Sequence, residues 1–189
     1  HTMYANTLDR ILALFLWKLS VLEDVETNIL KNVVKERMVA VDIGANIGYY
    51  TLQFAKLVGS QGKVFAFEPA PDNYALLVKN IKANKYENVI HIRKAVSTKT
   101  ARGNLFICEE HRGDHRIFDS QDSRNSIEIE TIALDDFFTE KDPIDIIKMD
   151  IQGAEYLALL GMENLIRRNR RLILITEFSP GLLRKCGFS

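Results

Sequence analysis

The residues best placed to do chemistry are Asp42, Gly44 and Gly48. Asp42 lies near the end of an apolar run that predicts a buried strand over 38–43. The two glycines predict a tight turn, and residues 47–58 predict the helix that leaves it. A strand, a glycine turn and a helix N-terminus together form a binding crevice at the carboxyl end of a sheet.

The charge of Asp42 decides which ligand suits this crevice. Two like unit charges ~4 Å apart repel by ~1 kcal/mol in water and by ~4 kcal/mol at an effective dielectric constant of 20, so a pyrophosphate is disfavoured. The spacing Asp-x-Gly-x-x-x-Gly also differs from the Gly-x-Gly-x-x-Gly of dinucleotide sites. A ligand with a cationic amino-acid head fits better, and S-adenosylmethionine (SAM), with an ammonium and a sulfonium, is the best match.

Further carboxylates end the other predicted strands. Glu68, Asp150 and Glu177 each lie at or near a strand end. Because the carboxyl ends of parallel strands meet in one crevice, we expect these side chains to converge with Asp42. Glu68 follows the glycine turn by about one βαβ step, where a carboxylate can accept both ribose hydroxyls. That placement alone would also suit a NAD site.

The rest of the chain supplies the elements that position these residues. From residue 38 onward strands and helices alternate, which predicts an α/β fold with a doubly wound, mostly parallel sheet. A β-hairpin insertion with a long polar tip is expected after the third strand. We expect strands at 38–43, 63–68, 89–96, 104–108, 126–133, 144–150 and 171–177, and helices at 47–58, 71–83, 134–139, 154–168 and 180–185.

Five blocks of sequence, in order, resemble the FkbM family of SAM-dependent methyltransferases. The resemblance runs from about Val39 to Phe178 and implies the class I methyltransferase fold. It also implies methyl transfer, usually to an oxygen of a sugar or a natural product. The matching blocks are residues 41–51, 67–74, 94–97, 131–137 and 147–155.

The resemblance also implies roles for single residues. Glu68 would hold the ribose of SAM, and Asp150 would lie closest to the transferred methyl group. Ala95 and Val96 would lie near the adenine. The methionine end would be surrounded by Asp42, Gly44, Ala45, Asn46 and Gly48.

Two features depart from the family pattern. Gln152 stands where the family usually has Glu, which puts a base or metal-ligand role for that position in doubt. The chain also ends at Ser189, before two further strands of a class I sheet could form. We therefore expect a C-terminally incomplete sheet with one open edge.

Catalysis on a hydroxyl acceptor needs alignment and removal of a proton. The candidates are Asp150 and Glu155, with His115 third. Each carboxylate has a simpler reading, because Asp150 could cap the following turn and Glu155 could favour a helix N-terminus. Lys148, inside a core strand, indicates pairing with a carboxylate of the crevice.

The polar loop at residues 109–116 contains His111, Asp114 and His115. Two histidines four residues apart could bind a metal on a helix, but Gly113 and the polar surroundings favour a loop, and no metal is expected. A lid that faces the substrate and a solvated hairpin tip remain open alternatives.

Composition limits the partners. Lys plus Arg and Asp plus Glu number 25 each, which argues against non-specific nucleic-acid binding. Apolar residues make up 47% of the chain, as in ordinary globular proteins. Cys108 and Cys186 match no metal spacing and predict free thiols in a reducing, cytoplasmic setting.

The expected organisation is a helical segment over 4–37, packed on a SAM-binding domain over 38–189. Residues 1–3 are set aside as a remnant before the start. A helix over 9–35 is expected to pack on the domain or form a homodimer contact, with a membrane-surface anchor as the alternative. Its apolar stretch, 11–22, is too short to span a bilayer.

These observations favour a SAM-dependent O-methyltransferase acting on a sugar or small-molecule hydroxyl. Two other functions stay open at this stage. One is a SAM-fold module that binds without catalysis, and the other is a NAD-dependent oxidoreductase.

Overall fold

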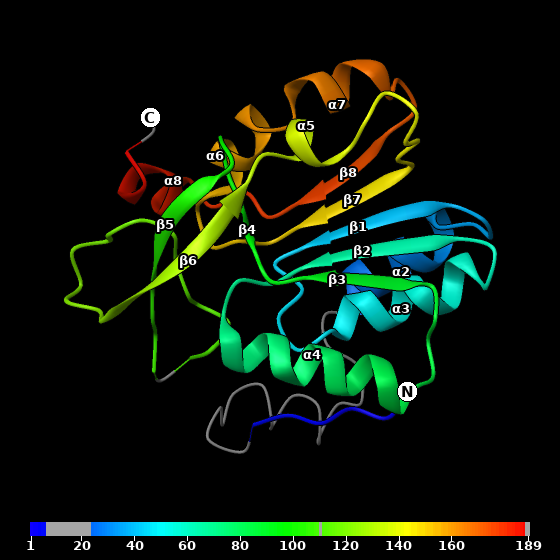
Figure 1. The fold of residues 1–189 in the computed structure, drawn as a ribbon, viewed down its shortest axis with the longest axis horizontal. Helices are drawn as coiled ribbons and strands as arrows, with labels where there is room; N and C mark the ends of the chain where they lie inside the picture. Colours follow the sequence, from blue (N-terminus) through cyan, green and yellow to red (C-terminus); the bar gives the residue numbers. More distant parts are fainter. Residues whose placement is uncertain (7–23, 110, 188–189) are drawn as a thin grey trace.

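The structure is a computed structural model that describes residues 1–6, 24–109 and 111–187. Within these residues, five short apolar strands form one parallel sheet in the order β3-β2-β1-β7-β8 (Figure 1). Runs rich in Val and Ile form such strands because both faces of a parallel sheet are buried. The strands are β1 (Val39–Ile43), β2 (Lys63–Phe67), β3 (Val89–Ile92), β7 (Ile146–Met149) and β8 (Ile173–Thr176).

The strand order confirms the doubly wound α/β fold. The chain runs outward from β1 through β2 to β3, then returns to the other side of β1 as β7. The strand order therefore reverses between β1 and β7, and such a switch point opens a crevice outside the carboxyl ends of the strands. The register places Asp42 of β1 beside Lys148 of β7.

Helices cover both faces of the sheet (Figure 1). One face packs on α2 (Asp24–Val33), α3 (Tyr49–Val58) and α4 (Pro71–Ala83), and its core contains Leu30, Phe54 and Val64. The other face packs on α5, α6 and α7, where Ala158, Met162 and Leu165 are fully buried. The remaining helices are α5 (Leu134–Phe137), α6 (Glu155–Leu160), α7 (Glu163–Arg168) and α8 (Pro180–Lys185).

The expected hairpin insertion is confirmed, but the single strand expected over 89–96 is wrong. It divides into β3 and β4 (Ala95–Val96), and β4 joins a separate sheet with β5 (Ala101–Phe106) and β6 (Ser126–Ile132) in the order β4-β6-β5. The break follows from tertiary pairing, because Ala95 and Val96 find parallel partners in β6 rather than in β2.

The single helix expected over 154–168 is also wrong, since α6 and α7 are separate. They divide at Gly161, where a Cβ atom would lie 2.0 Å from the carbonyl oxygen of Ser97. The carboxylate of Asp135 then caps the new helix by accepting the N–H groups of Asn164 and Leu165 at 3.0 and 2.7 Å. Both causes come from remote segments.

The helical segment expected over 4–37 stays a prediction, because residues 7–23 lie outside the described residues. Leu30 and Val34 pack in the core. Among residues 1–3, Thr2 exchanges hydrogen bonds with the Asn84 side chain at 2.9 and 2.7 Å. No helix within the described ranges is long and apolar enough to cross a membrane.

Candidate functional site

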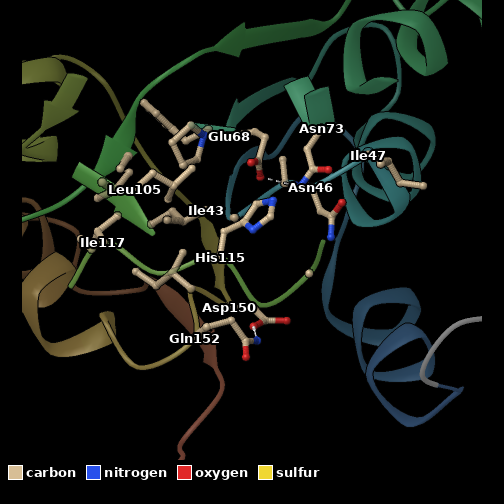
Figure 2. Close-up of a pocket in the computed structure, with 18 of the residues that line it drawn as sticks. Ile43, Asn46, Ile47, Glu68, Asn73, Leu105, His115, Ile117, Asp150 and Gln152 are labelled. Atoms are coloured by element: carbon tan, nitrogen blue, oxygen red, sulfur yellow. Dashed lines mark hydrogen bonds between the residues drawn. The ribbon is translucent and has the colours of Figure 1, made fainter. Parts of the chain in front are cut away.

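A cavity opens at the carboxyl ends of β1, β2 and β7, where the fold predicts a ligand site (Figure 2). It contains about 900 Å³ of empty space, part of it open to solvent. Of the predicted site residues, it is lined by Gly44, Ala45, Asn46, Glu68, Ala95, Val96 and Asp150. The third base candidate, His115, lines it as well.

Gly44 is needed for two separate reasons. Its φ of 79° is a left-handed conformation that L side chains rarely adopt. A Cβ atom there would also lie 2.1 Å from the carbonyl oxygen of Asp150. The N–H groups of Gly44 and Ala45 both donate to the carbonyl of Phe67, which ties the turn to the end of β2.

Gly48 does not line the cavity. It precedes α3 with a φ of 97°, and a Cβ atom would lie 2.8 Å from the Leu77 side chain of α4. Its contribution is therefore the close packing of α3 against α4, which sets the position of the turn.

Asp42 lies fully buried beneath the turn and does not line the cavity either. Its Oδ2 accepts a hydrogen bond from the hydroxyl of Thr51 at 2.6 Å, whereas no described residue donates to its buried Oδ1. Burial raises the pKa of this carboxyl, and the nearby Lys148 ammonium opposes that shift. Asp42 can thus reach a ligand only through its charge and its support of the turn.

Glu68 presents its carboxylate to the cavity (Figure 2). One oxygen accepts the N–H of Asn46 at 2.8 Å and the other accepts the N–H of Ala70 at 2.9 Å. The side chain of Asn73 also hydrogen-bonds this carboxylate, and since a carboxylate can accept about four hydrogen bonds, one position remains available to a ligand hydroxyl. Burial raises the pKa of Glu68 to about 7 despite the two amides.

The family assignment rests on a match over most of the chain. The sequence model described as "Methyltransferase FkbM domain" matches residues 42–185. The chain belongs to this family. The match covers every strand of the parallel sheet after the start of β1 and the whole insertion.

Several relatives of this FkbM domain are named as methyltransferases. The chain is 26% identical to "Methyltransferase sdnD" of Sordaria araneosa, over 76% of this chain and 68% of the relative. It is 28% identical to "Hexuronic acid methyltransferase AglP" of Haloferax volcanii, over 67% of this chain and 50% of the relative. The chain thus spans between half and about two thirds of the length of these relatives.

Solved structures share the fold at low sequence identity. A methyltransferase FkbM from Methylobacillus flagellatus superposes with a TM-score of 0.52, 20% identity and coverage of 74% of this chain and 32% of that chain. A SAM-dependent O-methyltransferase from Thermotoga maritima gives a TM-score of 0.52 at 15% identity, with coverage of 96% and 53%. A Streptococcus mutans protein in complex with S-adenosylhomocysteine (SAH) gives 0.52 at 13% identity, with coverage of 87% and 76%.

Asp150 of the FkbM domain sits at the mouth of the cavity between two donors (Figure 2). The Lys148 ammonium lies 3.6 Å from Oδ2, and the Gln152 amide donates to Oδ1 at 2.7 Å. The same amide donates to Glu177 at 3.3 Å. Burial and the Asp150 charge raise the pKa of Glu177 to about 7. Lys148 pairs with a crevice carboxylate, as the sequence indicated.

Glu155 is not among the residues that line the cavity. Its side chain is buried, and its Oε1 accepts the N–H of Ile151 at 3.0 Å, just before α6. Glu155 lies in the first turn of α6, in keeping with the simpler alternative of a carboxylate at a helix N-terminus, and its contact with Ile151 also holds the loop that carries Asp150.

The insertion of this FkbM domain forms one wall of the cavity. The sequence left this open, because it offered both a lid that faces the substrate and a solvated hairpin tip for the loop at residues 109–116. Leu105 and Ile117 pack in one apolar cluster with Ala95, and all three line the cavity. His111 and His115 do not share a helix face, because the loop turns at His111, whose carbonyl accepts the N–H of Asp114. Within the described ranges, no three His, Cys, Asp or Glu side chains converge as metal ligands.

Other lining residues were missed, among them Asn73, Tyr49 and Tyr50. Asn73 and both tyrosines lie inside the blocks that carry the family resemblance, so their position was the available signal. Tyr50 also faces the Lys148 ammonium, which lies 4.5 Å from the centre of its ring.

Proposed function

We propose that this domain binds SAM in the cavity and transfers its methyl group to a hydroxyl oxygen of a sugar or small molecule. The observation that carries the proposal is the Glu68 carboxylate, which lines the cavity at the switch point of an FkbM-family domain. SAM dependence of the structural neighbours supports the cofactor. Cytoplasmic action and a homodimer remain expectations.

The residues present fit each part of SAM. Glu68 would accept one ribose hydroxyl while it keeps both backbone partners, and a second hydroxyl would take the place of the Asn73 side chain. Ala95, Val96 and Leu105 would pack on the adenine. The carboxylates of Asp42 and Asp150 give the other end a negative charge that suits the ammonium and sulfonium. Gly44, Ala45 and Asn46 would shape the turn around the methionine portion, with Gly48 behind them.

For this reaction the protein must align the acceptor hydroxyl with the methyl group and provide a group that accepts the hydroxyl proton. SAM supplies an electrophilic methyl group when it is bound. Asp150 is the residue best placed to accept the proton of an acceptor hydroxyl, because it lines the cavity. The Lys148 ammonium and the Gln152 amide lie against its two oxygens and hold the carboxylate in place. Glu155 would act only through the loop it holds.

The acceptor is proposed from one relative. AglP is named as a hexuronic acid methyltransferase. Three cationic side chains line the cavity here, those of Lys94, Arg112 and Lys148. Each of them is paired with a carboxylate, that of Glu130, Asp72 and Asp150 in turn, so the relative alone supports a uronic acid as the acceptor. The NAD-dependent alternative has no support in a methyltransferase family.

Calorimetric titration with SAH tests the cofactor. We expect micromolar binding, near −8 kcal/mol, and a loss of at least tenfold in Glu68→Ala and Asp42→Asn. Glu87→Ala, an exposed carboxylate at the opposite end of the sheet, should bind as the wild type does. Absence of binding to the wild type would overturn the proposal.

Transfer of a labelled methyl group from SAM tests the reaction. We would screen hydroxylated sugars, uronic acids and small alcohols, with Asp150→Asn as the catalytic variant. Product with the wild type and at least a hundredfold slower turnover with Asp150→Asn is expected. Tight SAH binding without turnover on any acceptor would favour the non-catalytic module.

A further inference from the structure

His115 reaches the cavity from the insertion, not from the parallel sheet that carries the other polar lining residues. Its ring projects into the middle of the cavity, between the side of Glu68 and Asn46 and the side of Asp150 (Figure 2). Its position depends on the loop at residues 111–116, so the first question is whether that loop is held.

The loop is tied to α4 on one side. The side-chain amide of Asn73 donates to the carbonyl of Arg112 at 2.9 Å. The Arg112 guanidinium pairs with Asp72 at 2.7 Å, in the first turn of the same helix. Gly113 lies against the side chain of Asn46, because a Cβ atom there would be 3.5 Å from its amide nitrogen. The loop therefore closes over the glycine turn.

The other side of the loop is tied to the hairpin. Asp114 accepts hydrogen bonds from the guanidinium groups of Arg116 and Arg124 at 2.8 and 2.7 Å. The backbone of Arg116 pairs in both directions with Phe106 at the end of β5. His115 is thus held between two anchors, one on α4 and one on the second sheet.

The hydrogen bonding of His115 determines which ring nitrogen carries the proton. The backbone N–H of Cys108 donates to Nδ1 at 3.1 Å. A backbone amide can only donate, so Nδ1 must present a lone pair. A neutral imidazole then carries its hydrogen on Nε2, which has no hydrogen-bond partner among the residues the structure describes.

The charge state agrees with this geometry. Burial, together with the charges of Arg112 and Arg124, lowers the pKa of His115 to about 4. The ring is therefore neutral near pH 7. A general base would need a lone pair on Nε2, and that tautomer would set the Nδ1 hydrogen against the N–H of Cys108.

We propose that His115 is a neutral hydrogen-bond donor, which gives its Nε2–H to an oxygen of the bound SAM or SAH and is not the base of the reaction. This inference rests on the proposed function, because it takes SAM and SAH as the ligands. SAH carries two kinds of acceptor oxygen, the ribose hydroxyls and the amino-acid carboxylate. The shared chemistry is an oxygen acceptor that faces Nε2.

Calorimetry with two ligands tests the contact and identifies the oxygen. Loss of one hydrogen bond should weaken SAH binding about tenfold in His115→Ala. His115→Gln keeps an N–H donor of similar reach and should stay within about threefold of the wild type. 5′-Methylthioadenosine lacks the carboxylate, so an unchanged affinity for it in His115→Ala assigns the contact to the carboxylate, and a weakened one to the ribose.

The matched control is His111→Ala, which alters a histidine of the same loop that does not line the cavity. If His115→Ala binds SAH as His111→Ala does, the inference is wrong while the proposed function stands. If the wild type does not bind SAH, the proposed function is wrong, and the inference about His115 is then wrong as well.

Nitrogen-15 NMR of the free protein tests the tautomer without any ligand. We expect a protonated Nε2 and an unprotonated Nδ1 for His115 near pH 7, and a shift of the Nε2–H signal when SAH is added. A proton on Nδ1, or a cationic ring at that pH, would overturn the inference, whatever the affinities are.

Discussion

At the scale of single residues, two effects on the Glu68 carboxyl group oppose each other. Its carboxylate is almost fully buried, which disfavours its charge, yet a ribose ligand needs acceptor oxygens. The N–H groups of Asn46 and Ala70 offset only part of the burial. A site held in this way is stabilised by its ligand, because hydroxyl donors favour the ionised form.

This tension predicts a pH-dependent stability. The folded pKa of Glu68 is about 7 and its ordinary value is 4.5, so the stability that this group contributes is full below pH 4.5 and is lost as pH rises through 7. Relative to the wild type, Glu68→Gln should gain about 2–3 kcal/mol in unfolding free energy between pH 5 and pH 8. Urea unfolding at both pH values measures this. A difference that does not change with pH would contradict it, and Glu87→Gln is the control.

Gln152 is the second residue with a testable role, since its amide bridges Asp150 and Glu177. Glu, the residue usual in the family, would remove both donated hydrogen bonds and add a charge beside two carboxylates. Gln152→Glu should therefore lower the unfolding free energy by about 1 kcal/mol at pH 8 and by less at pH 5.

Urea unfolding of Gln152→Glu beside Gln61→Glu, an exposed position, separates the local effect from added net charge. Equal effects at the two positions would show that the bridge contributes nothing.

At the scale of elements, the turn after β1 is where three segments meet. Gly44 lets the loop after β7 approach the turn, and the carbonyl of Phe67 ties the turn to β2. The cavity exists because the backbones of the turn after β1, the loop after β7 and the end of β2 approach one another closely. This close approach does not depend on the side chains that line the cavity.

Gly44→Ala should lower the unfolding free energy by about 3 kcal/mol or more. The added Cβ atom would meet the carbonyl of Asp150 at 2.1 Å, and the backbone is left-handed there. Gly181→Ala is the control, since nothing lies within 4 Å of its Cβ position, and it should change stability by less than about 1 kcal/mol. Similar urea unfolding curves for the two variants would contradict the close approach.

At the scale of the whole molecule, the cavity joins parts that are otherwise separate. The parallel sheet supplies Glu68 and Asp150, whereas the second sheet and its loop supply Leu105 and His115. A ligand bound there contacts both and is expected to stabilise the fold as one unit.

SAH at one hundred times its dissociation constant should add about 2.7 kcal/mol to the unfolding free energy. For a domain of this size that corresponds to a rise of about 5–10 °C in melting temperature. Thermal unfolding with SAH and with NADH at equal concentration measures it. A shift with NADH alone would overturn the methyltransferase reading in favour of the oxidoreductase.

Local patterns in the sequence determined the strands, the glycine turn and the acidic strand ends, because short apolar runs, glycine spacing and helix starts are encoded within a few residues. Five blocks of residues also carried the family, which the match over residues 42–185 confirms. Glu68 and Asp150 line the cavity because each follows a strand of the parallel sheet, and their positions after predicted strands were visible in the sequence.

Tertiary structure alone decided where remote segments meet. The split of residues 89–96 needs the β6 partner, and the break between α6 and α7 needs Ser97 and Asp135. Tertiary structure also buries Asp42 and keeps Glu155 out of the cavity lining. The tautomer of His115 depends on its contact with the backbone of Cys108. Such effects arise only once the chain is folded, because they depend on distances in space and not on spacing in the sequence.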